Sequence, residues 1–208
     1  GLNVAVPFAV VPPPAVVGQA RPRVAVLREQ GVNGQVEMAA AFDAAGFDAV
    51  DVTMTDLLSD RVRLAEFCGG RTVLDLCCYT GGFAVQAKTL GNAAEVTGVD
   101  LDEEPLQLAR ENANLNQVRV RFVQSDAFIY MREMLQQGRQ YDVVVLDPPK
   151  LIRNRAELEE GTRKHFDLNR LAMRLVRPGG LLLSCCCSGL LQEADFVRLV
   201  CSASYQAG

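Results

Sequence analysis

Acidic side chains accompany three successive predicted strands of this 208-residue chain. Asp75 lies in the buried stretch 72–76, Asp100 ends the next strand, and Asp126 follows the strand after that. A carboxylate at a strand end can accept hydrogen bonds from both hydroxyls of a ribose, and the next one is placed to meet an adenine amino group. The series predicts a site for S-adenosyl-L-methionine (SAM). The alternative for each Asp is that it only caps the following helix.

A glycine-containing loop follows the first of these strands. Gly81 and Gly82 have no Cβ, so the backbone N–H groups of this loop can approach a ligand closely. The chain has no GxGxxG motif here, which makes a dinucleotide the less expected ligand. The predicted cofactor-binding residues are Asp75, Tyr79, Thr80, Gly81, Gly82, Phe83, Asp100, Leu101, Asp126, Ala127 and Asp147.

Alternating strands and helices must position these residues. Strands are predicted at 72–76, 95–99, 119–123, 141–146 and 181–185, with a turn at 178–180 before the last of them; helices are predicted up to 90 and at 103–114, 127–137, 156–176 and 193–201. An earlier β-α-β unit comprises strands 24–27 and 48–52 around a helix at 35–45. This alternation predicts an α/β fold with a doubly wound parallel sheet, whose ligand site lies at the carboxyl ends of the strands.

The composition excludes several classes of protein. With 49% hydrophobic residues and a net charge of −4, the chain is neither a disordered protein nor a strongly basic nucleic-acid module, and it has no apolar run long enough to span a membrane. Five of the seven cysteines are sequence neighbours, which indicates a reducing compartment and therefore a cytoplasmic protein. One His and no CxxC pair predict no metal site.

Four segments together resemble one group of class I methyltransferases. They are 73–84 (VLDLCCYTGGFA), 99–100 (VD), 147–150 (DPPK) and 184–190 (SCCCSGL). Over about residues 62–208 the chain is similar to the bacterial 23S rRNA cytosine-5 methyltransferases that carry a PUA domain. The resemblance implies a Rossmann-like methyltransferase fold, SAM as the cofactor, ribosomal RNA as the partner, and a role in rRNA processing.

The same resemblance assigns catalytic residues. Carbon 5 of cytosine needs a thiolate addition at carbon 6 before it can accept a methyl group, and Cys187 falls on the family's nucleophile position. Cys185 and Cys186 are then strand residues facing the core; alternatively, all three are small core residues. Asp147 would bind the base edge and protonate N3, with Pro148 and Pro149 shaping the loop under the base.

The segment after this loop is locally basic. Residues 148–178 hold eight Lys and Arg against four acids, where RNA phosphates would lie. Lys150, Arg153 and Arg155 are predicted substrate contacts, and Lys150 stands where methyltransferases of exocyclic amines have an aromatic residue. The alternative is a solvated helix face with i,i+4 ion pairs, to which His165 would belong.

The N-terminal third resembles a different family. Three segments, 21–34 (RPRVAVLREQGVNG), 37–42 and 45–49, are similar to the start of the glutamine amidotransferase domain of phosphoribosylformylglycinamidine synthase, over about residues 21–67. The family's catalytic Cys, His and Glu have no counterparts here. We therefore expect a chimera: a Pro-rich linker (1–20), an amidotransferase-like fragment (21–66), and a methyltransferase domain (67–208) that lacks its PUA domain and its last two strands. Strands 24–27 and 48–52 are expected to extend the shortened sheet.

Two alternatives to an active enzyme follow from this expected organisation. One is a non-catalytic chimeric fusion that keeps the fold and a SAM pocket. The other, more distant, is a fragment of a purine-biosynthesis enzyme.

Overall fold

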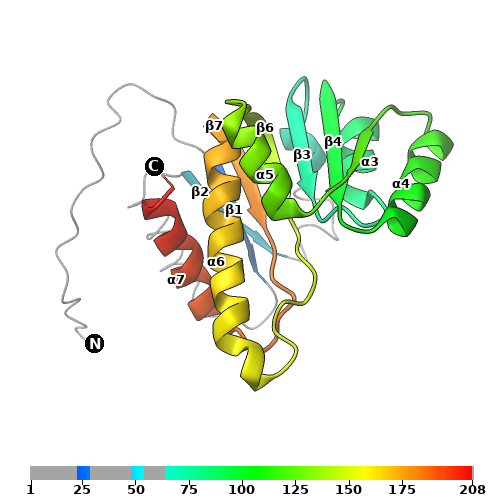
Figure 1. The fold of residues 1–208 in the computed structure, drawn as a ribbon. Helices are drawn as coiled ribbons and strands as arrows, with labels where there is room; N and C mark the ends of the chain where they lie inside the picture. Colours follow the sequence, from blue (N-terminus) through cyan, green and yellow to red (C-terminus); the bar gives the residue numbers. More distant parts are fainter. Residues whose placement is uncertain (1–22, 29–47, 54–63, 208) are drawn as a thin grey trace.

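One parallel sheet of seven strands organises the molecule (Figure 1). The computed structural model describes residues 64–207 and the backbone of strands 23–28 and 48–53; the predicted linker and the helix at 35–45 lie outside these residues. The strand order is β2-β1-β7-β6-β3-β4-β5, and every described pair of neighbours is parallel. The strands are β1 (Arg23–Arg28), β2 (Asp48–Thr53), β3 (Thr72–Leu76), β4 (Glu95–Asp100), β5 (Arg121–Gln124), β6 (Tyr141–Leu146) and β7 (Val176–Ser184).

Helices cover both faces of this sheet, as the alternating sequence predicts. The α-helices are α3 (Gly82–Thr89), α4 (Glu103–Leu115), α5 (Ala127–Gln136), α6 (Leu158–Leu175) and α7 (Glu193–Tyr205), with 3-10 turns η1 (Leu64–Phe67) and η2 (Arg155–Glu157). Figure 1 shows α6 and α7 running side by side over one face. The predicted α/β, doubly wound architecture is therefore confirmed. No helix among residues 64–207 is both long and apolar enough to cross a membrane.

The period-2 alternation of β3 shows how the sequence builds two cores. Leu74 and Leu76 belong to the core under α5, α6 and α7, whereas Val73 belongs to the smaller core under α3. Burial of each such leucine stabilises the fold by about 2 kcal/mol. Asp75 shares the α3 face with Val73, so a carboxyl group is fixed inside the sheet layer one residue before β3 ends.

The N-terminal strands extend the sheet beside β7, as expected. Ala25 pairs with Leu183, and β2 pairs in turn with β1 from Arg23↔Asp48 to Arg28↔Thr53. Both edges of β7 are thereby paired.

Two predicted boundaries differ from the structure. The predicted turn at 178–180 lies inside β7, because β6 pairs Tyr141 with Val176 but Val143 with Leu181, so residues 177–180 form a bulge with Gly179 at φ 77°. Helix α7 runs to Tyr205 instead of ending at Cys201, since Ala203 and Ser204 are also buried on its inner face.

Candidate functional site

The carboxyl ends of β3, β4, β5 and β6 lie along one edge of the sheet and bring four carboxyl groups near each other. Asp75 and Asp100 lie at the ends of β3 and β4, and Asp126 and Asp147 follow β5 and β6. Hydrogen bonds tie these ends together: Asp147 N–H donates to Leu76 O, and Ser125 N–H to Asp100 O. The series predicted from sequence is thus assembled at one edge.

The loop after β3 has an unusual backbone. Cys77, Tyr79 and Gly81 all have positive φ (60°, 50° and 77°), and at the two non-glycine positions this conformation costs of order 1–3 kcal/mol each. A Cβ at Gly81 would lie 3.0 Å from the Phe122 ring, so this position requires glycine. Alternating backbone conformations of this kind turn N–H groups toward one concavity and favour an anionic or polar ligand.

Two residues that the sequence did not single out hold this loop. Asn112 of α4 donates its side-chain N–H to Thr80 O at 3.0 Å, and the Phe122 ring of β5 packs against Gly81 and Gly98. The sequence around these two residues does not show that they hold the loop, because one is an ordinary polar helix residue and the other an ordinary apolar strand residue. Only the fold brings them to the loop.

Asp75 is the most constrained carboxyl group of the site. It is fully buried; its Oδ2 accepts the Ala84 N–H at 3.0 Å, while its Oδ1 has no partner among the described residues. Burial raises the pKa of Asp75 to about 7 against the effect of the Ala84 N–H, and the charges of Asp147 and Asp100 raise it further. An unsatisfied buried acceptor costs about 1–3 kcal/mol, which a ligand donor would remove.

Asp100 and its neighbours form the more open part of the site. The Asp100 carboxylate accepts the N–H groups of Tyr79 (2.8 Å) and Asp102 (3.1 Å), and each oxygen retains a further lone pair. The side chains of Tyr79 and Leu101 are 66% and 61% exposed, so an aromatic or apolar ligand surface could cover them.

Asp126 caps helix α5 by accepting the Ile129 N–H at 3.1 Å. The helix-capping alternative is therefore correct at this position. Phe83 and Ala127 are half-buried beside these groups.

A second group of residues lies where β6 and β7 end. Cys185 N–H donates to Leu146 O at 2.9 Å, Ile152 N–H donates to the buried Ser188 Oγ at 3.3 Å, and the Cys187 Sγ lies 3.7 Å from Pro148 O. These contacts hold the Cys187 turn against the turn at 147–150. Burial raises the pKa of Asp147, so this carboxyl keeps its proton to higher pH than usual. Cys187 is exposed beside it.

The prediction that Cys185 and Cys186 are strand residues is wrong, whereas Cys186 does pack against the core, as predicted. The pairing with β6 ends at Leu146↔Ser184, so both cysteines follow the strand and are only half-buried. Burial, together with the charge of Asp147, raises the pKa of Cys185 to about 12, and burial also raises that of Cys186. Both groups are therefore protonated thiols near neutral pH. All seven cysteines are free.

His165 does not lie on a solvated face, contrary to the prediction. Its side chain is 1% exposed, meets the Phe196 ring edge-on, and places Nε2 3.6 Å from the Cys186 Sγ. Burial lowers the pKa of His165 to about 4, so the ring is neutral at pH 7. The helical spacing of His165, Leu168 and Ala172 would have revealed this buried stripe.

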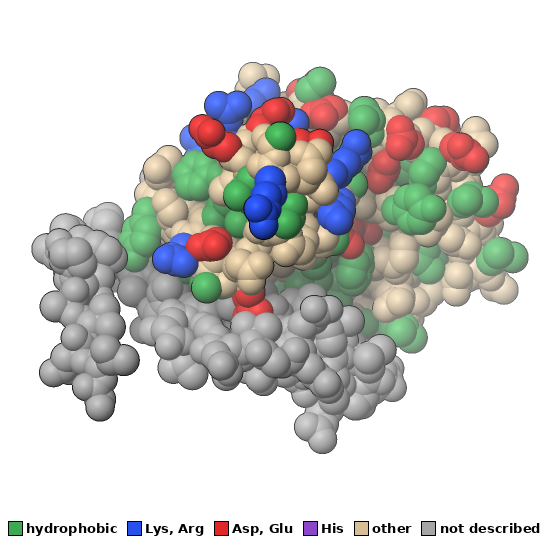
Figure 2. Space-filling model, turned by 90° about the horizontal axis from the view of Figure 1, so that it is seen from below, with side chains coloured by type: hydrophobic (Ala, Val, Ile, Leu, Met, Phe, Trp, Pro, Cys, Tyr) green, Lys and Arg blue, Asp and Glu red, His purple; other side chains and the backbone are tan. Residues whose placement is uncertain are grey.

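The basic segment is largely the solvated face that the alternative described. Lys164 pairs with Glu160 at 2.7 Å and Arg170 with Asp167 at 3.3 Å. Figure 2 shows Lys and Arg side chains interspersed with acidic and hydrophobic ones on the face seen from below. Lys150, Arg153 and Arg155 are exposed in the turns after Pro149, and none of them pairs with an acid within the described part of the chain.

Comparison with known sequences finds two families. Residues 69–206 match the family described as a methyltransferase domain, and residues 21–98 match a CobB/CobQ-like glutamine amidotransferase domain. The chain is 42% identical over 156 residues to the ribosomal RNA large subunit methyltransferase I of Aeromonas hydrophila, and 38% identical to that of Yersinia pestis strain Angola. Each alignment covers 74% of this chain but 39% of the relative, so the chain spans about two fifths of the length of these curated relatives.

Comparison with solved structures gives the same fold. A protein described as a methyltransferase, crystallised with SAH, superposes with a TM-score of 0.60 and 25% identity, over 71% of this chain and 39% of its own. TrmN from Thermus thermophilus superposes with a TM-score of 0.51 over 86% of this chain and 64% of its own; at 23% identity, this likeness concerns the fold alone.

Proposed function

The chain belongs to the methyltransferase domain family, and from this premise we propose that it binds SAM at the carboxyl ends of β3–β6 and methylates carbon 5 of a cytosine in large-subunit ribosomal RNA. The observation that carries the proposal is the position of the Cys187 thiol over the turn that begins at Asp147. The same sheet edge holds Asp75, whose Oδ1 has no partner among the described residues. Residues 67–208 would form the SAM-dependent domain.

The residues at this edge suit SAM. Asp75 offers a buried acceptor without a partner, which matches the cationic amino group of the methionine part of SAM. The free lone pairs of Asp100 suit the ribose hydroxyls, and the exposed Tyr79 and Leu101 offer apolar surface for adenine. The N–H groups around Gly81 and Gly82 would contact the rest of the ligand. When bound, SAM supplies an electrophilic methyl group on its sulfonium.

The chain's own residues would then activate the base. The Cys187 thiolate adds to carbon 6 of cytosine, and the electron pair displaced from the 5,6-double bond makes carbon 5 nucleophilic enough to accept a methyl group. The proton on carbon 5 then passes to water, and departure of the thiolate restores the 5,6-double bond. Return of the N3 proton to the Asp147 carboxylate leaves a neutral methylated base. Cys187 suits this role because it is exposed, whereas Cys185 and Cys186 are half-buried and burial raises the pKa of their thiols.

Asp147 would assist the addition. Because burial raises the pKa of Asp147, its carboxyl keeps a proton to higher pH than an ordinary aspartate and would donate it to N3 as negative charge develops on the base. The buried Pro148 and the exposed Pro149 fix the turn against which the base would lie. Lys150, Arg153 and Arg155 are exposed just beyond it and would contact the flanking phosphates.

The product of the reaction tests this proposal. The chain is incubated with large-subunit rRNA fragments and SAM carrying a tritiated methyl group, and the RNA is then digested to nucleosides. We expect radioactivity to co-elute with 5-methylcytidine and to be absent when Cys187 is replaced by Ala. Label in any other nucleoside would contradict the cytosine-5 assignment while leaving SAM-dependent methylation intact.

A further inference from the structure

The amino-terminal ends of the strands, opposite the proposed active site, carry a hollow that the function above does not use. It has a volume of about 960 Å³ and adjoins a second hollow of about 640 Å³; Thr97, Arg121, Arg139 and Tyr141 line both. We call the pair the amino-edge groove. The cationic side chains that line it are Lys88, Arg119, Arg121, Arg139 and Arg177.

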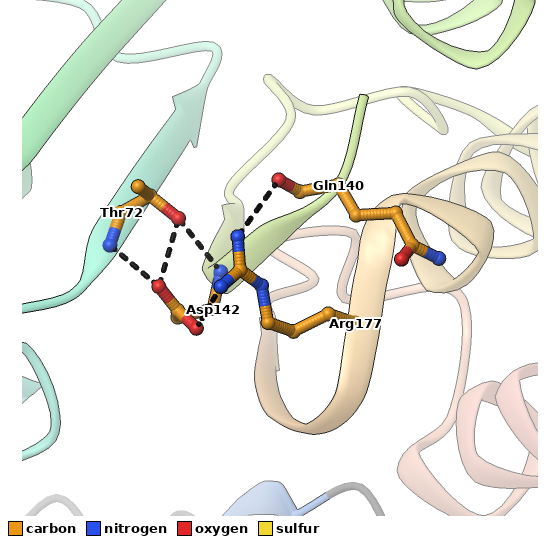
Figure 3. A network of polar contacts seen from close by, with 4 residues as sticks. All are labelled: Thr72, Gln140, Asp142 and Arg177. Carbon is orange, nitrogen blue, oxygen red and sulfur yellow. Dashed lines mark hydrogen bonds and ion pairs between the residues drawn. The ribbon is translucent and has the colours of Figure 1, made fainter. Parts of the chain in front are cut away.

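A polar network between β3, β6 and β7 includes three residues that line the groove, Thr72, Gln140 and Arg177 (Figure 3). The Asp142 carboxylate accepts the Thr72 N–H (2.7 Å) and hydroxyl (2.9 Å) and pairs with Arg177 at 3.0 Å. Burial alone would raise the pKa of Asp142, but the hydrogen bonds from Thr72 and the Arg177 charge hold it below its usual value. Arg177 also donates to Gln140 O at 3.5 Å. Arg177 is therefore engaged within the protein.

Three other arginines of the groove form no such ion pair or side-chain hydrogen bond with the described residues. Arg119, Arg121 and Arg139 are exposed, and the described residues offer none of them an ion pair or a side-chain hydrogen bond. Burial raises the pKa of Tyr130, and the positive charges of Arg121 and Arg139 act against this, so both guanidinium groups lie near the Tyr130–Tyr141 hydroxyl pair. Glu95 and Glu133 are the acids lining the two hollows. The groove is thus positively charged in a chain whose net charge is −4.

The length of the groove indicates what fills it. The lining of the larger hollow comes from the starts of β5, β4, β3, β6 and β7, which are five neighbouring strands, whereas the smaller hollow continues along β5 and α5. Four spacings of about 4.8 Å make the larger hollow about 19 Å long, too long for a single ion and suited to an extended polyanion. Guanidinium groups bind phosphate in a planar, two-pronged geometry, and Thr72, Thr97 and Gln140 add polar groups to a lining that also contains valines.

We infer that the amino-edge groove binds the phosphate backbone of a single RNA strand through Arg119, Arg121 and Arg139. This inference rests on the proposed function for the identity of the polyanion, and it places an RNA contact on the edge of the sheet opposite Cys187. An RNA that reaches both edges would contact the domain at the base to be modified and again, independently of sequence, at a distant stretch of backbone.

Fluorescence anisotropy of an end-labelled single-stranded RNA of about 20 nucleotides without cytosine tests the groove separately from the proposed active site. The triple variant R119Q/R121Q/R139Q should bind about tenfold or more weakly at low salt. The slope of log K against log salt should fall by about 2, since each lost phosphate contact removes about 0.7. The control R110Q/R132Q/R198Q removes the same charge from arginines that already contact Glu103, the Phe128 ring and Asp195.

The outcomes separate the alternatives. Binding that is retained by the control and lost by the groove variant supports the inference. Equal loss in both variants, no loss in either, or displacement of the RNA by millimolar inorganic phosphate or by poly-glutamate would overturn it. SAM binding, measured on the same proteins, reports on the proposed function alone, because none of the groove arginines belongs to that site.

Discussion

Replacing Cys187 by serine should abolish methyl transfer, by at least about 10³-fold, while leaving SAM binding unchanged. Serine has nearly the same volume but is far less nucleophilic near neutral pH, so the addition to carbon 6 would fail. The measurement is covalent capture: an RNA containing 5-fluorocytidine cannot lose fluorine from carbon 5, so the thiol adduct persists. Wild-type protein should form a complex that survives denaturing electrophoresis, and Cys187→Ser should form none.

The two neighbouring thiols provide the controls for this prediction. Cys186→Ser keeps a group that can hydrogen-bond to His165, whose Nε2 lies 3.6 Å from the Cys186 Sγ. Both Cys185→Ser and Cys186→Ser should still be captured, because these thiols are protonated and partly buried in the wild type. Capture of Cys187→Ser together with its loss in Cys185→Ser or Cys186→Ser would mean that the nucleophile had been misassigned.

Replacing Asp75 by asparagine should stabilise the folded chain above pH 7 and weaken SAM binding about tenfold or more. The pKa of Asp75 in the folded chain, about 7, lies above its ordinary value. The protonated carboxyl therefore makes its full contribution to the free energy of unfolding below about pH 4, and this contribution is lost as the pH rises through 7. At pH 8 ionisation costs about 4 kcal/mol. Asparagine avoids this cost but leaves a buried amide unsatisfied, at about 1–3 kcal/mol. The net gain is on the order of 2 kcal/mol.

Urea denaturation at a series of pH values measures this effect. The difference in unfolding free energy between Asp75→Asn and wild type should widen from about pH 4 to 7 and then level off. The neutral His165 ring has the opposite pH dependence, because its contribution to the free energy of unfolding is lost as the pH falls from about 6.5 to 4. Since both proteins contain His165, this effect cancels when their unfolding free energies are subtracted. Asp142→Asn is the control, because the pKa of Asp142 is lowered, so that variant should be less stable at pH 8. A destabilised Asp75→Asn at pH 8 would contradict the assignment.

The strands that build the site could be predicted from the sequence because their signals are local. The bounds of β3 and β6 match the predicted ranges, since each is a short apolar run followed by a polar turn. The acids at their ends follow from those bounds. The parallel order then brings the acids to one edge, which is a property of the fold class.

Other features of the fold and the site depend on contacts between distant segments, which no local sequence pattern predicts. The bulge at 177–180 follows from the register between β6 and β7, and the strained backbone at Cys77 and Tyr79 follows from how the loop meets Asp100. The amino-edge groove draws its arginines from separate segments that meet only across the sheet. His165 was the exception, because its helical period could have shown that it is buried.

Calorimetric titration with SAM tests most directly whether the carboxyl edge of this sheet is a SAM site. We expect one SAM to bind per wild-type chain, and Asp100→Asn and Asp100→Ala to lose at least about tenfold in affinity, because a carboxylate that accepts ribose hydroxyls is removed. Asp102→Ala, whose exposed side chain makes no cap to α4, should bind like wild type. A folded wild-type chain that gives no binding heat, or Asp100 variants that bind as tightly as wild type, would contradict the account.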